Sequence, residues 1–164
     1  MKGAGRTIRR RRREGKTDYK ARLGFLKSGM PRVIVRKTNR YILGQIVVSD
    51  ISQDRIILSV NSKDLLTNGW PKEMGGSLKS LPAAYLTGFL LGKKAKDIDE
   101  AILDIGLQRN IKKSRLYAFL KGLVDAGFKI GHKESVLPDE EMMGKNEKTA
   151  NLISKIRSSL EEGV

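Results

Sequence analysis

The feature that most limits how this chain can fold is the uneven distribution of its charge. Residues 1–40 hold 15 of the 33 lysines and arginines but only two of the 18 acidic residues, which gives a net charge of +13. Residues 41–164 carry only +2 and resemble an ordinary folded domain. Because cations at such density repel one another, this N-terminal quarter of the chain is expected to meet a polyanion.

Composition narrows the possible chemistry. Hydrophobic residues make up 39% of the 164 residues and aromatic residues 5%, so a core must rest on Leu, Ile, Val and Ala. The absence of cysteine excludes disulfides, a thiolate nucleophile and a cysteine-ligated zinc, and suits a reducing cytoplasm. His132 is the only histidine, so a tetrahedral zinc site has too few ligands. Because Lys129 and Lys133 lie near it, we expect a solvated loop residue with no catalytic role.

Hydrophobic segments are too short for a membrane protein. No apolar run follows the basic N-terminus, so no secretory signal is expected. The longest uncharged stretch, 80–92, is well below the roughly 20 residues of a membrane-spanning helix. We therefore expect no membrane association.

Apolar periodicity predicts the order of the elements. Residues 1–16 have almost nothing to bury and should form a basic, extended segment. A short amphipathic helix is expected at about 18–28, with Thr17 as a possible cap and Tyr19, Leu23 and Leu26 on its apolar face. Runs 32–37, 41–49 and 55–61 indicate a three-stranded antiparallel meander, in which Ile56, Leu58 and Val60 share a face.

The second half predicts helices packed on this sheet. After a loop at 62–79, Ser80 begins a helix, 101–106 is a buried strand, Ser114 caps a second helix that ends at Gly127, and a last helix spans about 146–161. The expected fold is α/β (α+β-like), with a βββαβα mixed sheet and packed helices. The expected divisions are a basic extension at 1–16, a globular core at 17–132 and a C-terminal segment with a helix at 133–164.

Basic residues continue beyond the extension into these elements. On 32–37, Arg32, Ile34 and Arg36 share one face and Val33 and Val35 the other, which predicts a basic outer face and a buried valine face. Arginine binds phosphate bidentately and stacks on bases, and the alternative for the arginine run is a solvated tail. Tyr19 and Tyr41 are best placed to stack on bases, although core packing is expected for both.

Composition alone does not separate DNA from RNA. No helix-turn-helix spacing, zinc finger or basic zipper is present, whereas an arginine-rich arm that orders on binding suits folded RNA. A second cationic segment, 108–115, lies between the buried strand and the helix after it, where anions are commonly held. This loop is either a further RNA contact through Lys112, Lys113 and Arg115, or a solvated turn.

One enzymatic alternative is a metal-dependent nuclease of the RNase H-like class, which also begins with a three-stranded meander. Asp50, Glu100 and Asp104 would then bind the metal. For Asp104 the structural alternative is a carboxylate at a sheet edge or a cap. The glycine pattern at 88–93 is not a phosphate-binding loop, because it is one residue short, lacks the following Ser or Thr, and lies in a helical pattern.

Three segments resemble one known family. REGKTDYKARLGFLKSGMPRVIVRKTNRYILGQIV (13–47) is similar to the signature region of large-ribosomal-subunit protein eighteen in its archaeal and eukaryotic branch. AILDIGLQRNIKKSRLYAFLKGLVDAGFKIGH (101–132) and LPDEEMMGK (137–145) resemble the second half of that family's core and its C-terminal segment. The loop at 110–115 departs from the family in being richer in lysine.

This resemblance implies a structural ribosomal protein without cofactors. It would bind 5S rRNA in the central protuberance, next to large-subunit rRNA and ribosomal protein five. By position, the resemblance assigns RNA contacts to Arg9, Arg10, Arg11, Arg12, Arg13, Lys16, Lys20, Arg22, Arg32, Arg36 and Arg40. Charge and position add Arg6, Lys37, Lys112, Lys113 and Arg115, and the possibility of base stacking adds Tyr19.

Overall fold

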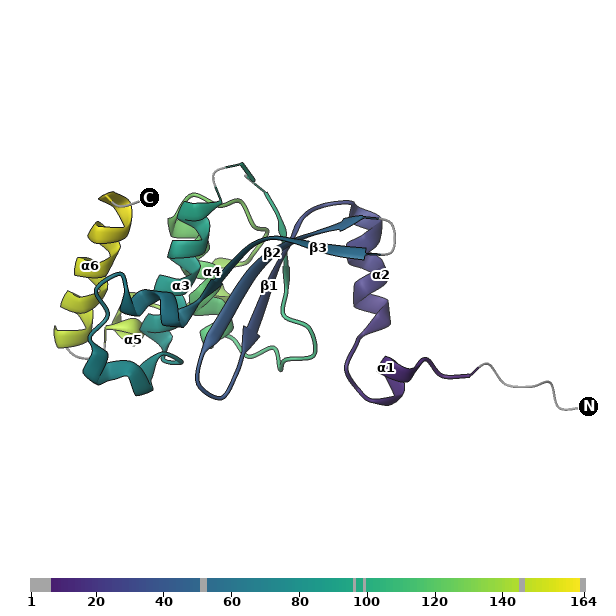
Figure 1. Cartoon of the computed structure of the whole chain (residues 1–164), viewed down its shortest axis with the longest axis horizontal. Coiled ribbons are helices and arrows are strands. Elements are labelled where there is room, and N and C mark those ends of the chain that lie inside the picture. Colours follow the sequence, from purple (N-terminus) through teal and green to yellow (C-terminus); the bar gives the residue numbers. More distant parts are fainter. Residues whose placement is uncertain (1–6, 51–52, 96, 99, 145–146, 163–164) are drawn as a thin grey trace, which may run out of the picture.

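The computed structural model describes residues 7–50, 53–95, 97–98, 100–144 and 147–162. Its helices are α1 (Arg10–Arg13), α2 (Tyr19–Ser28), α3 (Leu81–Lys94), α4 (Arg115–Asp125), α5 (Glu140–Met143) and α6 (Glu147–Glu162). Its strands are β1 (Arg32–Lys37), β2 (Ile42–Asp50), β3 (Gln53–Asn61) and β4 (Ile102–Asp104), and its short 3-10 helices are η1 (Ser62–Leu66), η2 (Lys72–Ser77) and η3 (Glu134–Val136). In Figure 1, α3, α4 and α6 lie to one side of the sheet, and α1 and α2 lie beyond its opposite end.

The four strands form one mixed sheet in the order β3-β2-β1-β4. The first three strands pair antiparallel, and β4 joins the edge parallel to β1. This confirms the predicted βββαβα order, since a parallel partner for β1 requires the intervening helix α3 as a crossover. A bulge interrupts the pairing of β2 with β3, because Ile46 pairs with Leu58 while Val47 pairs with Ile56. Only Val60 of the predicted apolar face is buried, and Ile56 is exposed.

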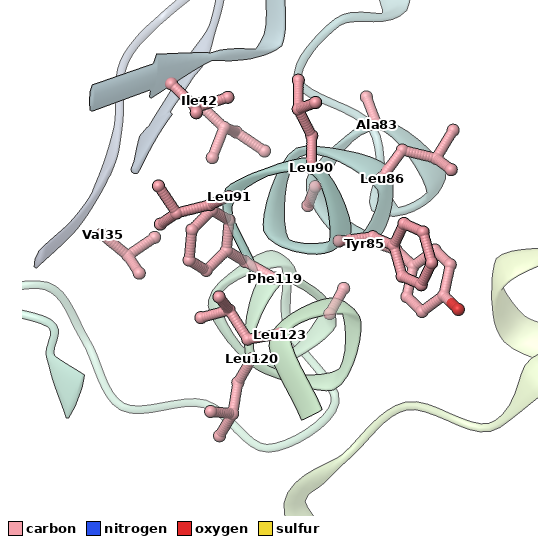
Figure 2. Packing of buried hydrophobic residues seen from close by; sticks show 14 of the residues in the cluster. Val35, Ile42, Ala83, Tyr85, Leu86, Leu90, Leu91, Phe119, Leu120 and Leu123 are labelled. Carbon is pink, nitrogen blue, oxygen red and sulfur yellow. The ribbon is translucent and has the colours of Figure 1, made fainter. Parts of the chain in front are cut away.

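Helices α3 and α4 cover one face of the sheet. The Phe119 ring lies near Val35 and Leu91 in Figure 2, and Val33 and Val35 are fully buried, as predicted for that strand. At the crossing, a side chain on Gly88 would collide with the backbone of Phe119, and one on Gly122 with the backbone of Tyr85. Gly88 therefore permits close packing of the two helices. This packing role accounts for the glycine at 88 in the 88–93 pattern, which does not form a phosphate-binding loop.

The C-terminal helix α6 packs on α3. Ile156 and Leu160 are buried in the core, and the Arg157 guanidinium lies 5.2 Å from the centre of the Phe89 ring. Arg157 Nη1 also donates to the Tyr85 hydroxyl, which in turn donates to Asp125 at 2.8 Å. Burial and the adjacent Asp125 carboxylate raise the pKa of Tyr85, so the hydroxyl remains a donor. These contacts join α6 to the α3–α4 pair.

Local details differ from expectation in three places. Asp18, not Thr17, caps α2, and its carboxylate accepts from the backbone N–H groups of Lys20 and Ala21. Ser114 occupies the N-cap position of α4, but its hydroxyl makes no capping hydrogen bond. The strand predicted at 101–106 is shorter, because Gly106 turns the chain with a φ of 60°. In the described part of the chain, no helix has the length and apolarity that crossing a bilayer requires.

Candidate nucleic-acid interface

The N-terminal arm, defined here as residues 7–28, exposes a dense array of cations. Arg9 to Arg13 and Lys16 are all exposed, and Arg10 to Arg13 form the single turn α1. Glu14 accepts ion pairs from Lys16 at 2.9 Å and from Arg10 at 3.8 Å, and the Arg11 guanidinium donates to Thr17. Residues 9–22 hold eight cations against the carboxylates of Glu14 and Asp18, so most of the arginines face solvent without a counter-ion. Arg6 lies outside the described residues.

Helix α2 contributes a basic and apolar surface but no core residue. None of its ten residues is buried, although Leu23 and Leu26 were predicted to form an apolar face. The Tyr19 side chain, for which core packing was expected, also stays out of the core and lies under the Arg9 guanidinium, 5.0 Å from the ring centre. Lys20 is exposed, whereas Arg22 is half-buried and donates to Asp54 at 2.9 Å. Among described residues, this is the one ion pair between the arm and the rest of the chain.

Arginines on the outer face of the sheet have a different environment. Arg32 was expected to face RNA, yet it is only 2% exposed and forms ion pairs with Asp54 at 2.8 Å and Asp104 at 3.3 Å. Arg36 is partly exposed, binds Asp104 at 3.3 Å, and donates to two backbone carbonyls. The two aspartates neutralise the arginines that strand alternation placed on this face. Arg32 is therefore a structural residue in this conformation, and only the edge of Arg36 is accessible.

Asp54 links the arm to this network. Burial acts to raise the pKa of its carboxyl, but hydrogen bonds from Arg22, Ser49 and Arg32 outweigh it and hold the pKa below its ordinary value. The carboxylate is thus ionised at neutral pH and bound from two sides, by α2 and by β1. No local sequence pattern singles out Asp54, because its partners lie 22 and 32 positions away and meet it only in the folded sheet.

The carboxylates of the nuclease alternative do not form a metal site. Asp104 is buried, holds Arg32 and Arg36, and accepts from the Gly106 backbone N–H at 2.7 Å. Asp50 and Glu100 are both exposed, at the end of β2 and in an isolated bridge to Lys129. In the described segments, no three acidic or histidine side chains are grouped so that they could hold a metal ion. Asp104 therefore has the structural role of a capping, ion-paired acid.

A second cationic area forms where the loop before α4 meets the end of β1. Gln108 accepts from the Lys37 backbone N–H at 3.1 Å and donates to the carbonyls of Val35 and Ile105. This brings exposed Lys37 beside the loop, around a hollow of about 490 Å³. Its cationic lining is formed by Lys37, Arg109, Lys113 and Arg115.

Within this loop the lysines differ. Lys113 has a φ of 55°, unusual for a residue other than glycine, and its ammonium donates to Asp139 at 2.6 Å. That contact lowers the pKa of Asp139. Lys112 is exposed. The structure thus brings Lys113 and Arg115 together with Lys37, a proximity that the sequence did not indicate.

Around the β1–β2 turn, exposed Arg40 lines a smaller hollow with Tyr41, Gly75 and Lys79. Tyr41 packs against the core, as expected, and carries the Lys63 ammonium 4.5 Å above its ring centre. Lys63 and Lys79 were not predicted as site residues. They lie in the loop after the meander, and no sequence signal distinguishes them from other solvated lysines.

Comparison with known proteins gives consistent matches. A model of the family described as "Ribosomal large subunit proteins 60S L5, and 50S L18" matches residues 6–100. The large ribosomal subunit protein uL18 of Korarchaeum cryptofilum is 50% identical over 156 residues, which cover 94% of this chain and 76% of that protein. The uL18 proteins of Methanothermobacter thermautotrophicus and Methanoculleus marisnigri are 48% and 49% identical over 80% and 82% of this chain, covering 67% and 75% of those proteins.

Proposed function

Because the chain belongs to the uL18 family of large-subunit ribosomal proteins, we propose that it binds 5S rRNA and attaches it to large-subunit rRNA in the central protuberance. The role is structural and not enzymatic. Ribosomal protein five is the proposed protein neighbour. The first contact is made by the N-terminal arm, and the second by the loop before α4.

The observation that carries this proposal is the set of exposed arginines in the arm. Arginine donates in a planar fork that matches two phosphate oxygens, and each phosphate contact releases bound counter-ions from the RNA. Arg9 to Arg13, Lys16 and Lys20 are all exposed, and the two acids of residues 9–22 cannot neutralise the eight cations there. Binding also removes the repulsion among the arginines, so the arm becomes more ordered on RNA than alone.

The second contact rests on the hollow lined by Lys37, Arg109, Lys113 and Arg115. These cations come from the end of β1 and from the loop that leads into α4, which Gln108 holds together, so their spacing is fixed before binding. We propose that an RNA phosphate occupies this hollow, with Lys112 at its rim. Arg40 and Lys79 extend the cationic area around the β1–β2 turn.

Titration of 5S rRNA with the full chain tests the proposal, with an unrelated structured RNA of equal length as the control. We expect binding to 5S rRNA to be at least roughly tenfold tighter than binding to the control. This threshold is modest, because specific complexes usually exceed non-specific binding by a larger factor. Equal affinity for both RNAs would remove 5S rRNA from the proposal. Cleavage of either RNA on addition of magnesium would contradict a structural role.

A further inference from the structure

Among the described residues, the apolar face of α2 is not covered by any part of the core. Leu23 is 54% exposed, Leu26 is 37% exposed, and both lie on the same side of the helix as Tyr19. Facing them is Ile8, which is 64% exposed. Exposed apolar side chains scattered singly are ordinary, but these line one groove of about 540 Å³ between the two segments of the arm.

Three arginines border this groove. Arg9, Arg12 and Arg22 line it together with the apolar side chains. The Arg9 guanidinium stacks over the Tyr19 ring, so the exposed aromatic face is already covered by a flat cationic group. The ligand that fits such a groove has a flat apolar part for the ring and the leucines, and a negative charge for the arginines.

We propose that this groove, the arm groove, binds one unpaired nucleotide of the RNA, with its base stacked on Tyr19. The base takes the place of the Arg9 guanidinium over the ring, and Arg9 and Arg12 then bind the adjacent phosphates. Leu23 and Leu26 contact the edge of the base. A base in a regular duplex is stacked on both sides, so the groove selects a bulged or looped nucleotide.

This inference rests on the proposed function and specifies which part of the RNA the arm recognises. Stacking is not ionic, so its loss should lower affinity without changing the dependence on salt. Loss of a phosphate contact should change both. The two kinds of contact in the arm groove can therefore be measured separately.

The experiment titrates a 5S rRNA transcript at several salt concentrations with the full chain and with Tyr19→Phe, Tyr19→Leu and Tyr19→Ala. We expect Tyr19→Phe to bind like the wild type, and Tyr19→Leu and Tyr19→Ala to bind roughly tenfold more weakly, the size of one base–aromatic contact, at an unchanged salt slope. The matched control, Arg12→Gln with Arg13→Gln, should reduce the magnitude of the slope by about 1.5. Irradiation of the wild-type complex, with 4-thiouridine in the transcript, should give a nucleotide adduct on α2.

Each other outcome decides the matter. Wild-type affinity in Tyr19→Leu, or no adduct on α2, overturns the arm groove as a nucleotide site while the proposed function stands. A reduced salt slope in Tyr19→Leu shows that the ring only positions Arg9, and also overturns it. If the wild-type chain does not prefer 5S rRNA to the control RNA, both proposals fall. If Tyr19→Ala loses binding to phosphatidylglycerol vesicles but keeps its RNA affinity, the groove meets a lipid surface instead.

Discussion

The arginines of the N-terminal arm and those of the sheet look alike in the sequence but have opposite surroundings. On the sheet, Asp54 and Asp104 hold Arg32 and Arg36, and Arg32 is buried. On the arm, Arg9 to Arg13 are exposed, with Glu14 as the one acid paired to them among described residues. Arginine count alone therefore does not identify a binding surface. A binding surface is identified by how few carboxylates the fold brings to each arginine.

The same contrast separates folding from binding. The core is made by the four strands, by helices η1 and α3 to α6 and by the loops between them, and none of its buried residues comes from the described part of the arm. Changes in the arm should thus alter RNA affinity at constant stability, and changes in the α3–α4 crossing should alter stability first.

Deletion of residues 1–16 should produce the largest change. It removes eight basic residues, so affinity for 5S rRNA should fall by roughly 100-fold or more at moderate salt. The thermal midpoint should stay nearly unchanged, because residues 7–16 bury nothing. Filter binding and circular dichroism melts measure the two quantities. A loss of cooperative unfolding would show that the extension is part of the core.

Two glycine-to-alanine changes contrast the regions directly. Gly122→Ala should destabilise the fold by about 3 kcal/mol, because the new methyl group would collide with the Tyr85 backbone. That loss corresponds to a fall in the melting temperature of roughly 6–12 °C. Gly24→Ala in α2 has open space around it and should increase helicity without lowering the melting temperature. Similar melting temperatures for the two variants would mean that the helices do not cross as described.

The sequence predicted the fold well where the apolar pattern was continuous. β1 occupies the predicted residues 32–37, α3 starts after Ser80, and the resemblance of 13–47 to the protein eighteen family is confirmed by the comparisons. It was less informative where tertiary contacts decide. The bulge at Ile57 turns Ile56 outward. Helix α2 is exposed because no described core element packs on its apolar face, which its own sequence does not indicate.

Site residues divide along the same line. Exposure of Arg9 to Arg13 followed from local charge repulsion, which needs no knowledge of the fold. Burial of Arg32 depends on Asp54 and Asp104, which lie 22 and 72 positions along the chain, and no local pattern links them. The proximity of Lys37 to Arg115 likewise depends on the way Gln108 joins the loop to β1.

The loop before α4 should give an intermediate effect. Changing Lys112, Lys113 and Arg115 to Gln should weaken 5S rRNA binding by a few-fold per charge, with Lys113 contributing least because Asp139 already pairs with it. The control variant replaces three exposed lysines outside this loop with Gln, namely Lys129, Lys133 and Lys155. If the two triple variants bind alike and enter large subunits alike, the loop is a solvated turn.

The smallest effect concerns acid stability. Because the folded pKa of Asp54 is lowered, its contribution is fully present above the ordinary carboxyl pKa and is lost as pH falls through the folded value. The urea midpoint of the wild type should therefore fall more between pH 5 and pH 2 than that of Asp54→Asn. Parallel curves for the two proteins would show that the Arg22–Asp54–Arg32 link does not stabilise the fold.

The salt dependence of 5S rRNA binding tests the central claim most directly, because it counts the phosphates that the chain contacts. With about eight contacts, the plot of log affinity against log salt should have a slope of roughly −5 to −6, and affinity should fall near 10³-fold between 50 and 200 mM salt. The chain that lacks residues 1–16 should show a much shallower slope. A slope near −1 for the full chain, or equal slopes for both chains, would contradict an interface built on the exposed arginines of the arm.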